Sequence, residues 1–390
     1  MGDRLSVGVP RESLPSETRV AMVPAQVPAL EKAGLAVVVE SAAGDPAGYT
    51  DELYVANGAA IGDRKDALGA DIVLQVRTAA ADLEHAAADL ALLRSGAVVI
   101  GLCEPLDHRE GVETLARTGA TVFALEFVPR IARAQHMDAL SSQSSIAGYS
   151  AVVMAADRLP KIFPMLTTAA GTVSPARVLV IGAGVTGLQA IATAKRLGAV
   201  VEAYDVRPAA QEDVESVGAK LLQLPLQPGD AQDAGGYAKD LGESFYQRQQ
   251  EFLVQVVANV DVVITTAAIP GRPAPILLTE DAVRGMGFGS VIVDVAAPRG
   301  GNCAVTVPNE EVRVGGVTVL GPTNLPAHAP FHASQLYARN VTNFLLAMVK
   351  EGAFAPDEDD QVVSETLLAR GGRVVHPRLA PSPTPEEVSA

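Results

Sequence analysis

Short apolar runs alternate with longer amphipathic segments along the first 125 residues. Segments 25–33 and 79–93 are amphipathic, as expected of helices lying on a sheet, and the second is polar on one side and rich in alanine and leucine on the other. The apolar runs between such segments have the length of strands and fall at residues 5–9, 35–39, 72–76, 98–102 and 122–125. This alternation predicts a mainly parallel sheet with helices on both faces.

A second unit of the same kind is expected between about residues 145 and 326. Its strands are predicted at residues 177–181, 200–204, 262–265, 291–295 and 317–320. Residues 334–350 have apolar positions at helical spacing, so we expect them to pack back on the first domain. The expected fold is α/β, with two Rossmann-like doubly wound parallel-sheet domains separated by a cleft. We expect one domain to comprise residues 1–142 plus 328–390 and the other residues 143–327.

Three segments are expected to lie outside the regular elements. The connection between residues 205 and 254 is long, and its breaker-rich stretch 227–236 predicts a mobile loop. Residues 356–360 read as a solvated acidic loop, and residues 381–385 as a frayed end.

A glycine-rich turn joins the strand at 177–181 to a helix that opens at about Val185. Gly182 permits a tight turn, Gly184 lets the backbone approach a pyrophosphate, and Gly187 lets the helix pack closely on the strand. The helix N-terminus supplies unpaired N–H groups to the phosphates. Asp205 ends the next strand and is placed to bind a ribose diol and repel a 2′-phosphate. The unit predicts NAD(H) binding rather than NADP(H) binding, although a similar unit can hold FAD or another nucleotide.

Composition narrows the class of protein. A chain of 390 residues with 48% hydrophobic residues is long enough for two packed domains, and its formal charge of −15 argues against a nucleic-acid or anionic-lipid surface. Cys103 and Cys303 lie far apart and are expected to be buried free thiols. His328 and His332 have no third ligand nearby, so no metal site is expected. With no apolar run long enough for a membrane span, we expect a soluble, cytoplasmic chain.

The segment between the two domains is unusually polar. Arg130, Arg133, Gln135, Asp138 and Ser141 fall close together and are suited to positioning a nicotinamide carboxamide and its ribose. On composition alone, a polar linker in which a serine at 141 or 142 caps the next helix is an equally good interpretation.

Longer stretches of the chain closely resemble the NAD(H)-binding component of proton-translocating NAD(P) transhydrogenase, a family related to alanine dehydrogenase. The stretches are Arg133-Ala-Gln-x-Met-Asp-x-Leu-Ser-Ser-Gln-Ser, Thr167-Thr-Ala-Ala-Gly-Thr-Val-x-Pro-Ala-Arg and Leu188-Gln-Ala-Ile-Ala-Thr-Ala-Lys-Arg-Leu-Gly-Ala. The resemblance continues through Gly235-Gly-Tyr-Ala-Lys, Thr265-Thr-Ala-x-Ile-Pro-Gly-x-Pro-Ala-Pro and Gly300-Gly-Asn-Cys.

This resemblance implies roles for particular residues. It assigns Arg130, Gln135, Asp138 and Ser141 to a loop over the nicotinamide, with Gln135 nearest the hydride-transfer region. It places Tyr237 on a mobile loop that closes over the nucleotide and excludes water. The expected nucleotide site then comprises Gly182, Gly184, Val185, Gly187, Asp205, Val206, Arg207, Tyr237, Thr265 and Ala267.

Alanine dehydrogenase is the nearest alternative, because the chain shares its opening Val9-Pro-Arg-Glu and Thr18-Arg-Val-Ala. Such an enzyme requires a cationic carboxylate ligand and a general acid/base. This chain has Gln75 where that family has Lys, and Gly101-Leu-Cys-Glu where its His region lies, although Arg19 remains at the carboxylate-binding position.

The resemblance implies an enzyme subunit that passes hydride from NADH to NADP⁺ bound on a partner subunit. The expected partners are that NADP(H)-binding subunit and membrane-spanning subunits, with this chain a homodimer located in the cytoplasm, peripheral to the inner membrane. A self-sufficient amino-acid dehydrogenase and a non-catalytic NAD-binding protein are the alternatives.

Overall fold

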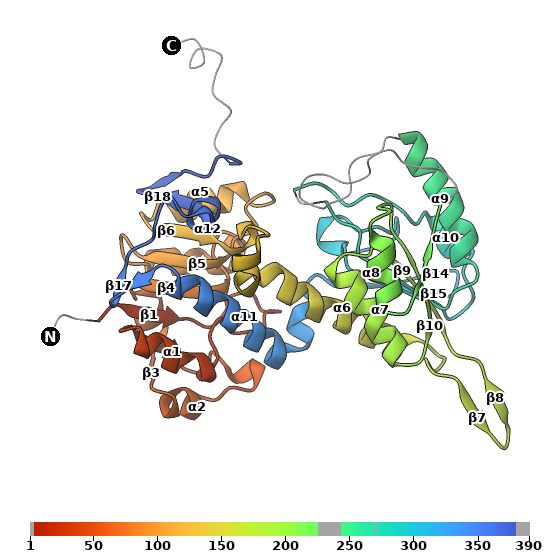
Figure 1. Cartoon of the computed structure of the whole chain (residues 1–390), viewed down its shortest axis with the longest axis horizontal. Coiled ribbons are helices and arrows are strands. Elements are labelled where there is room, and N and C mark those ends of the chain that lie inside the picture. Colours follow the sequence, from red (N-terminus) through yellow and green to blue (C-terminus); the bar gives the residue numbers. More distant parts are fainter. Residues whose placement is uncertain (1–3, 225–242, 270, 380–390) are drawn as a thin grey trace, which may run out of the picture. The chain divides into compact units, whose positions relative to one another are not determined.

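The computed structural model describes residues 4–224, 243–269 and 271–379. The chain divides into two compact units, one of Met1–Gln143 with Ala327–Ala390 and the other of Ser144–Pro326 (Figure 1). Each unit is built around a mainly parallel sheet, which confirms the predicted α/β class. The loop predicted at 227–236, Tyr237 and the end predicted to fray at 381–385 lie outside the described residues.

The sheet of the first unit has the order β19-β18-β6-β5-β4-β1-β2-β3. Neighbours from β3 to β6 are parallel, and the chain runs outward from β1 in both directions, which is the doubly wound arrangement. The parallel strands are β1 (Ser6–Val9), β2 (Ala36–Glu40), β3 (Ala60–Gly62), β4 (Ile72–Arg77), β5 (Val98–Leu102) and β6 (Thr121–Ala124). The connecting elements are η1 (Pro24–Gln26), α1 (Val27–Lys32), η2 (Asp45–Ala47), α2 (Asp51–Ala56), α3 (Arg64–Leu68), α4 (Leu83–Ala86), η3 (Ala87–Ala91), α5 (Arg109–Ala116), η4 (Leu125–Phe127) and η5 (Ala132–Met137).

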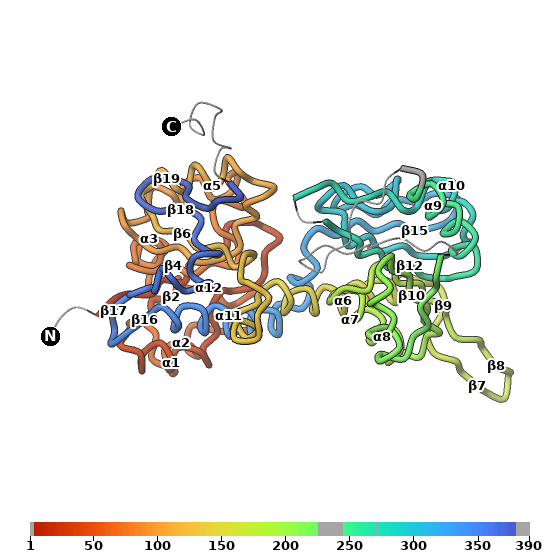
Figure 2. Tube along the Cα trace, turned by 45° about the horizontal axis from the view of Figure 1, so that its top comes forward, coloured from red at the N-terminus to blue at the C-terminus, as the bar shows by residue number. Residues whose placement is uncertain are grey.

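The C-terminal residues complete this first unit. Helix α11 (Pro330–Leu346) begins at Pro330, earlier than the predicted residue 334, because proline is well suited to a first helical turn. Tyr337, Val341 and Phe344 of this helix are buried in the core. Figure 2 shows the blue trace of α11 running among the elements of the first unit. Beyond it lie β16 (Val349–Lys350), β17 (Ala353–Phe354), α12 (Gln361–Thr366), β18 (Leu367–Arg370) and β19 (Arg373–Val374). Strand β18 pairs antiparallel with β6, an extension of the sheet that the sequence pattern did not predict.

The acidic segment 356–360 is not simply solvated. Asp360 is the N-cap of α12 and accepts a hydrogen bond from the Val362 N–H. Its carboxylate also pairs with Arg133 at 2.8 Å. The last acid of the segment therefore anchors it, because a helix N-terminus and an arginine both favour a carboxylate at this point.

The sheet of the second unit has the order β11-β10-β9-β12-β13-β15-β14. Its strands are β9 (Arg177–Ile181), β10 (Val200–Tyr204), β11 (Lys220–Leu222), β12 (Val262–Thr265), β13 (Val291–Asp294), β14 (Glu311–Val314) and β15 (Val317–Leu320), with β14 antiparallel at the edge. Val178 and Val180 belong to one core cluster and Leu179 and Ile181 to another. Both faces of the sheet are therefore buried, which explains the continuous apolar runs of its strands.

Helices and short turns connect these strands. Helix α6 (Ala139–Arg158) begins in the first unit and continues into the second. It is followed by α7 (Val185–Arg196), α8 (Ala210–Ser216), α9 (Glu243–Val257), α10 (Glu280–Arg284), η6 (Ala297–Arg299) and η7 (Leu325–His328). A separate hairpin of β7 (Leu166–Thr168) and β8 (Gly171–Val173) projects from the second unit (Figure 1).

Candidate functional site

The glycine turn between β9 and α7 has the geometry that its sequence predicts. Gly182 has a φ of +97°, a left-handed conformation that favours glycine, and its N–H donates to the Tyr204 carbonyl across the adjacent strand. A Cβ on Gly187 would lie 1.8 Å from the carbonyl oxygen of Gly182, so only glycine permits the helix to approach the turn this closely. A Cβ on Gly184 would meet no heavy atom within 4 Å, which leaves open space beside the N-terminus of α7.

Asp205 follows β10 and is joined to this turn. Its Oδ2 accepts a hydrogen bond of 2.7 Å from the N–H of Ala183, which lies between Gly182 and Gly184. Its side chain is 6% exposed, and Arg207 makes an ion pair with it at 2.8 Å. This contact raises the pKa of the Arg207 guanidinium, the hydrogen bond to Asp205 being the largest cause. The acid is therefore rigidly placed beside the turn, as a ribose ligand must be.

The loop that follows β12 also borders the glycine turn. Thr265 is fully buried and its hydroxyl donates to Asp294, so its side chain is structural. The Thr266 hydroxyl donates to the carbonyls of Ile181 and Gly182 and so fastens the loop to the turn. The next residue, Ala267, is held through its backbone N–H and C=O by the side chain of Asn302.

Buried Asp294 and Asn302 were not predicted as site residues. Asp294 ends β13 and accepts hydrogen bonds from Thr265, Ala296, Cys303 and Thr306. Its position, as an acid at the end of an apolar strand, could have indicated from the sequence that Asp294 holds the surrounding loops. Asn302 belongs to the Gly-Gly-Asn-Cys stretch, but nothing in its local pattern indicates that it holds a distant loop.

The polar segment of the first unit forms η5 and the start of α6. Asp138 caps α6, because its carboxylate accepts hydrogen bonds from the backbone N–H and the hydroxyl of Ser141. The capping residue is thus Asp138 and not a serine. Gln135 is exposed, as is Arg130. Asn340 and Asn343 of α11 both donate to the carbonyl of His136, which fixes the η5 turn that presents Gln135.

Helix α6 connects this segment with the glycine turn. It begins at Ala139, directly after the capping residue Asp138, and continues into the second unit. There, a Cβ on Gly148 would lie 2.2 Å from the carbonyl oxygen of Thr186, in the first turn of α7. Glycine at 148 therefore allows α6 to pack directly against α7, the helix that begins at the glycine turn.

The remaining predicted residues have less defined surroundings. Val185 begins α7 and is 41% exposed, and Val206 packs partly buried against the second-unit core. Tyr237 lies outside the described residues. Both cysteines are buried, and burial raises the pKa of the Cys303 thiol to about 11. Within the described ranges no cluster of three His, Cys, Asp or Glu side chains is arranged to bind a metal.

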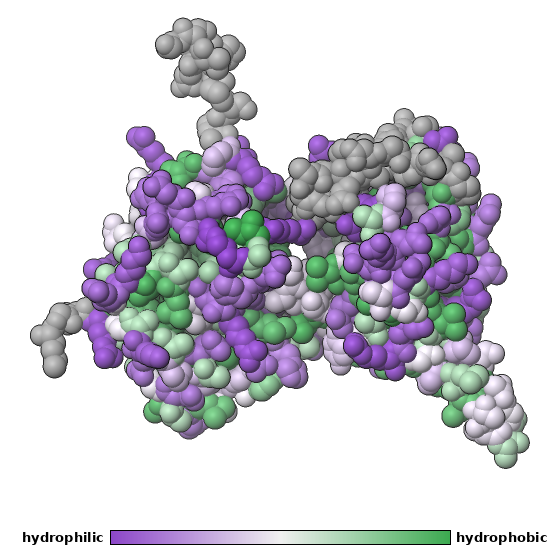
Figure 3. Space-filling view, in the orientation of Figure 1, coloured by the Kyte–Doolittle hydropathy of each residue, from purple (hydrophilic) through white to green (hydrophobic). Residues whose placement is uncertain are grey.

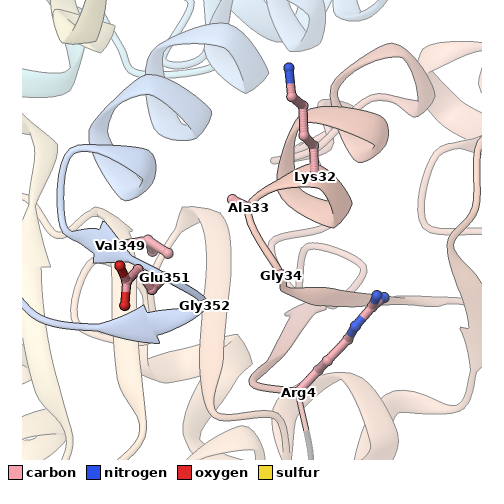
Figure 4. A pocket seen from close by; sticks show the side chains of 7 residues that line it. All are labelled: Arg4, Lys32, Ala33, Gly34, Val349, Glu351 and Gly352. Atoms are coloured by element: carbon pink, nitrogen blue, oxygen red, sulfur yellow. The ribbon is translucent and has the colours of Figure 1, made fainter.

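A surface hollow in the first unit is separate from these residues. It is lined by Arg4, Lys32, Ala33, Gly34, Val349, Glu351 and Gly352 (Figure 4). The side chains of Arg4 and Lys32 extend in different directions, so their charges do not converge on one ligand (Figure 4). Because Arg4 precedes β1, this hollow lies at the amino ends of the strands, whereas ligands of open α/β sheets bind at the carboxyl ends.

A glycine turn, a helix N-terminus and an acid after the second strand define a dinucleotide-binding α/β protein. Residues 8–147 match the family model "Alanine dehydrogenase/PNT, N-terminal domain", and residues 151–377 match "Alanine dehydrogenase/PNT, C-terminal domain". The chain therefore belongs to the alanine dehydrogenase/PNT family, and this membership implies the binding of a nicotinamide nucleotide.

Relatives indicate which branch of that family this chain resembles. It is 45% identical over 380 residues to an NAD(P) transhydrogenase subunit alpha chain of Rhodospirillum rubrum, covering 96% of this chain and 99% of that one. A solved transhydrogenase structure from Sinorhizobium meliloti is 43% identical, with a TM-score of 0.84 over 95% of this chain and 100% of that chain. The alanine dehydrogenase of Bacillus subtilis is 29% identical over 96% of this chain and 93% of its own length. The chain is thus of the transhydrogenase alpha-subunit type, as the resemblance predicted.

Within the described residues, no helix is both long enough and apolar enough to cross a bilayer.

Proposed function

We propose that this chain binds NADH at the glycine turn and passes hydride directly to NADP⁺ held by a separate subunit. The observation that carries the proposal is the anchoring of Asp205 to the turn through Ala183, because it sets a carboxylate where a ribose diol is recognised. Gly182, Gly184, Val185 and Gly187 supply the pyrophosphate cradle. Thr265 and Ala267 contribute backbone, since the Thr265 side chain is already used within the protein.

The segment containing Gln135 supports the redox step in this proposal. Hydride transfer between two nicotinamide rings requires no side-chain nucleophile, so the protein contributes binding and orientation. Correct orientation of two reactants replaces about 7–11 kcal/mol of a barrier. Exposed Gln135 stands on the η5 turn that α11 holds, and exposed Arg130 precedes that turn. Asp138 and Ser141 fix the start of α6 after it. We assign Gln135 the position nearest the transferred hydride, and Tyr237 the loop that closes over the nucleotide.

The proposed partners are an NADP(H)-binding subunit and membrane-spanning subunits, which would hold this chain in the cytoplasm, peripheral to the inner membrane. The glycine fingerprint after β9 accounts for one nucleotide, NAD(H), and the acceptor nucleotide is assigned to the partner. The names of the relatives, which call them alpha subunits, support an assembly of more than one kind of chain.

The β7–β8 hairpin supports the proposed homodimer. Each residue of its two strands is exposed, including Leu166 at 47% and Val173 at 48%, which pair across the hairpin. Met165 beside them is 64% exposed, and the projection carries apolar surface (Figure 3). An isolated two-stranded hairpin is at best marginally stable in water, and exposed apolar surface of this kind indicates an interaction site. We propose that a second copy covers it.

Amino-acid dehydrogenase activity is disfavoured by the buried polar groups of the first unit. Gln75 is uncharged and 3% exposed, and Cys103 is buried, with a thiol pKa raised by that burial. Neither group replaces the cation and the acid/base that imine chemistry requires. Arg19 is held by Glu17 through Nε and Nη2, and by Gln143 through Nη1. Its charge is therefore already compensated inside the protein.

Three measurements test the proposal, two on the purified chain alone and one after a partner component is added. Titration with NADH should show saturable binding, and incubation of NADH with pyruvate and ammonia should leave the nucleotide reduced. Addition of an NADP(H)-binding transhydrogenase component with NADP⁺ should then oxidise it. NADH oxidation by pyruvate and ammonia alone would make the chain an amino-acid dehydrogenase.

A further inference from the structure

The carboxylate of Asp205 already accepts four hydrogen bonds in the structure. Two come from backbone N–H groups, of Ala183 to Oδ2 and of Arg207 to Oδ1, at 2.7 and 2.8 Å. The other two come from the Arg207 guanidinium, with Nε on Oδ1 at 2.9 Å and Nη2 on Oδ2 at 2.8 Å. This is the two-pronged geometry in which arginine binds a carboxylate most strongly.

A ribose diol needs acceptor positions that this arrangement has filled. An ionised carboxylate offers about four lone-pair sites, and the four donors use them. The two backbone donors belong to the loops that shape the turn, so they are expected to stay. The guanidinium belongs to a side chain that is 19% exposed, and rotation of that side chain can carry it toward solvent. Adenosine ribose can therefore reach Asp205 only by displacing the guanidinium.

We infer that Arg207 is a displaceable internal ligand that occupies the ribose subsite and thereby sets both the affinity for NAD(H) and the tolerance of a 2′-phosphate. The inference rests on the proposed function, since it concerns the same nucleotide site. It gives Arg207 a role as competitor for Asp205, and not only that of a residue that contacts bound nucleotide.

The second half of the inference follows from charge. Asp205 alone would repel a 2′-phosphate, but the paired Arg207 neutralises it, and a guanidinium beside the ribose is the feature that accommodates this phosphate in NADP(H) sites. When the ribose displaces Arg207, the guanidinium stays tethered two residues from Asp205. The site therefore discriminates against NADP(H) less strongly than an unpaired aspartate would.

Direct binding titrations of NADH and NADPH to the isolated full chain test this. Arg207→Ala should tighten NADH binding by about threefold to tenfold, because the competitor is gone. The same substitution should raise the ratio of the NADPH to the NADH dissociation constant by about tenfold, because Asp205 is then unpaired. Arg207→Lys keeps the charge without the fork, so it should tighten NADH binding while leaving NADPH binding close to wild type.

Arg313→Ala is the matched control, because Arg313 also pairs with an acid two residues away but is 76% exposed on the edge strand β14. It should change neither dissociation constant. Weaker NADH binding by Arg207→Ala with an unchanged selectivity ratio, in a variant whose thermal unfolding matches wild type, would overturn the inference and leave the proposed function standing. If the wild-type chain binds no NADH at all, the proposed function itself fails.

Discussion

The carbonyl oxygen of Gly182 occupies the space that a Cβ on Gly187 would need, with 1.8 Å between them. Two residues of the same fingerprint are thus in backbone contact, while the third, Gly184, borders open space. The glycines of the turn therefore have different reasons to be glycine. Gly182 and Gly187 shape the protein itself, whereas Gly184 is explained by what the turn is proposed to bind.

Alanine substitutions separate these two reasons. Gly187→Ala forces α7 away from the turn and should lower the free energy of unfolding by about 2 kcal/mol or more. Gly184→Ala adds a methyl group at an N-cap with ordinary backbone angles, so it should cost no more than about 0.5 kcal/mol. It should nevertheless abolish most NADH binding, because the methyl group stands where the pyrophosphate approaches. Denaturant unfolding measures the stability of both variants, and NADH titration measures their affinity. A stable Gly184→Ala variant with wild-type affinity would contradict the proposal that the pyrophosphate binds at Gly184.

Substitutions of Gln135 and Asp205 should affect different steps, hydride transfer in one case and NADH binding in the other. Gln135→Asn shortens an exposed side chain on the η5 turn, so it should lower the rate of hydride transfer far more than the affinity for NADH. Asp205→Ala removes the proposed ribose ligand and should mainly weaken NADH binding. Stopped-flow transfer with an NADP(H)-binding partner and equilibrium titration measure the two effects. Equal losses in rate and affinity for both variants would contradict these assignments.

If the β7–β8 hairpin forms the dimer interface, one charged substitution on it should disrupt the dimer. Leu166→Asp places a carboxylate on the exposed apolar strand β7 and should shift the chain from dimer to monomer in sedimentation velocity. Leu53→Asp is the control, because Leu53 is 45% exposed on α2 in the first unit, close to the 47% of Leu166. It should leave the dimer intact. If Leu166→Asp sediments as wild type does, the hairpin is not the dimer contact.

Glu12 makes the stability of the first unit depend on pH. Burial, reinforced by Glu17, raises its pKa from 4.5 to about 8, although the N–H groups of Val76 and Arg77 donate to its carboxylate. The folded chain then holds a proton that the unfolded chain has released. Stability is therefore full below the unfolded pKa and is lost as pH rises from about 5 to about 8.

Glu12→Gln should flatten this part of the stability curve, measured by denaturant unfolding at several pH values. Burial also raises the pKa of Glu126, to about 7, so a smaller slope of the same sign should remain. Glu251→Gln, at an exposed position on α9, should leave the curve unchanged. An identical pH profile for Glu12→Gln and wild type would show that Glu12 does not hold this proton.

Sequence patterns predicted the strands best where both faces of a strand are buried. Val262–Thr265 and Val291–Asp294 are continuous apolar runs at the centre of a sheet, and they were recognised as strands. Ala60–Gly62 and Leu367–Arg370 were missed because they are edge or near-edge strands whose apolar sequences are too short to indicate a strand. Tertiary pairing, and not local preference, makes them strands.

The sequence predicted those parts of the candidate site that are formed by residues close together in the chain. The roles of Gly182 and Gly187 follow from a turn of fixed spacing. The ion pair between Asp205 and Arg207 was not foreseen, because two side chains two residues apart face each other only if the loop after β10 curls back. The hydrogen bond from Asn340 to the carbonyl of His136 joins residues 204 positions apart. A local sequence pattern cannot indicate a contact between residues so far apart.

Transfer of deuterium from NADH that carries deuterium at both C4 positions is the most direct test of the central claim. The chain should be mixed with an NADP(H)-binding partner and unlabelled NADP⁺ in ordinary water, and the NADPH formed should be analysed by mass spectrometry. Direct transfer predicts NADPH that carries the deuterium, and no NADPH when either protein is omitted. Unlabelled NADPH would contradict the account, as would deuterated alanine formed when pyruvate and ammonia replace the partner and NADP⁺.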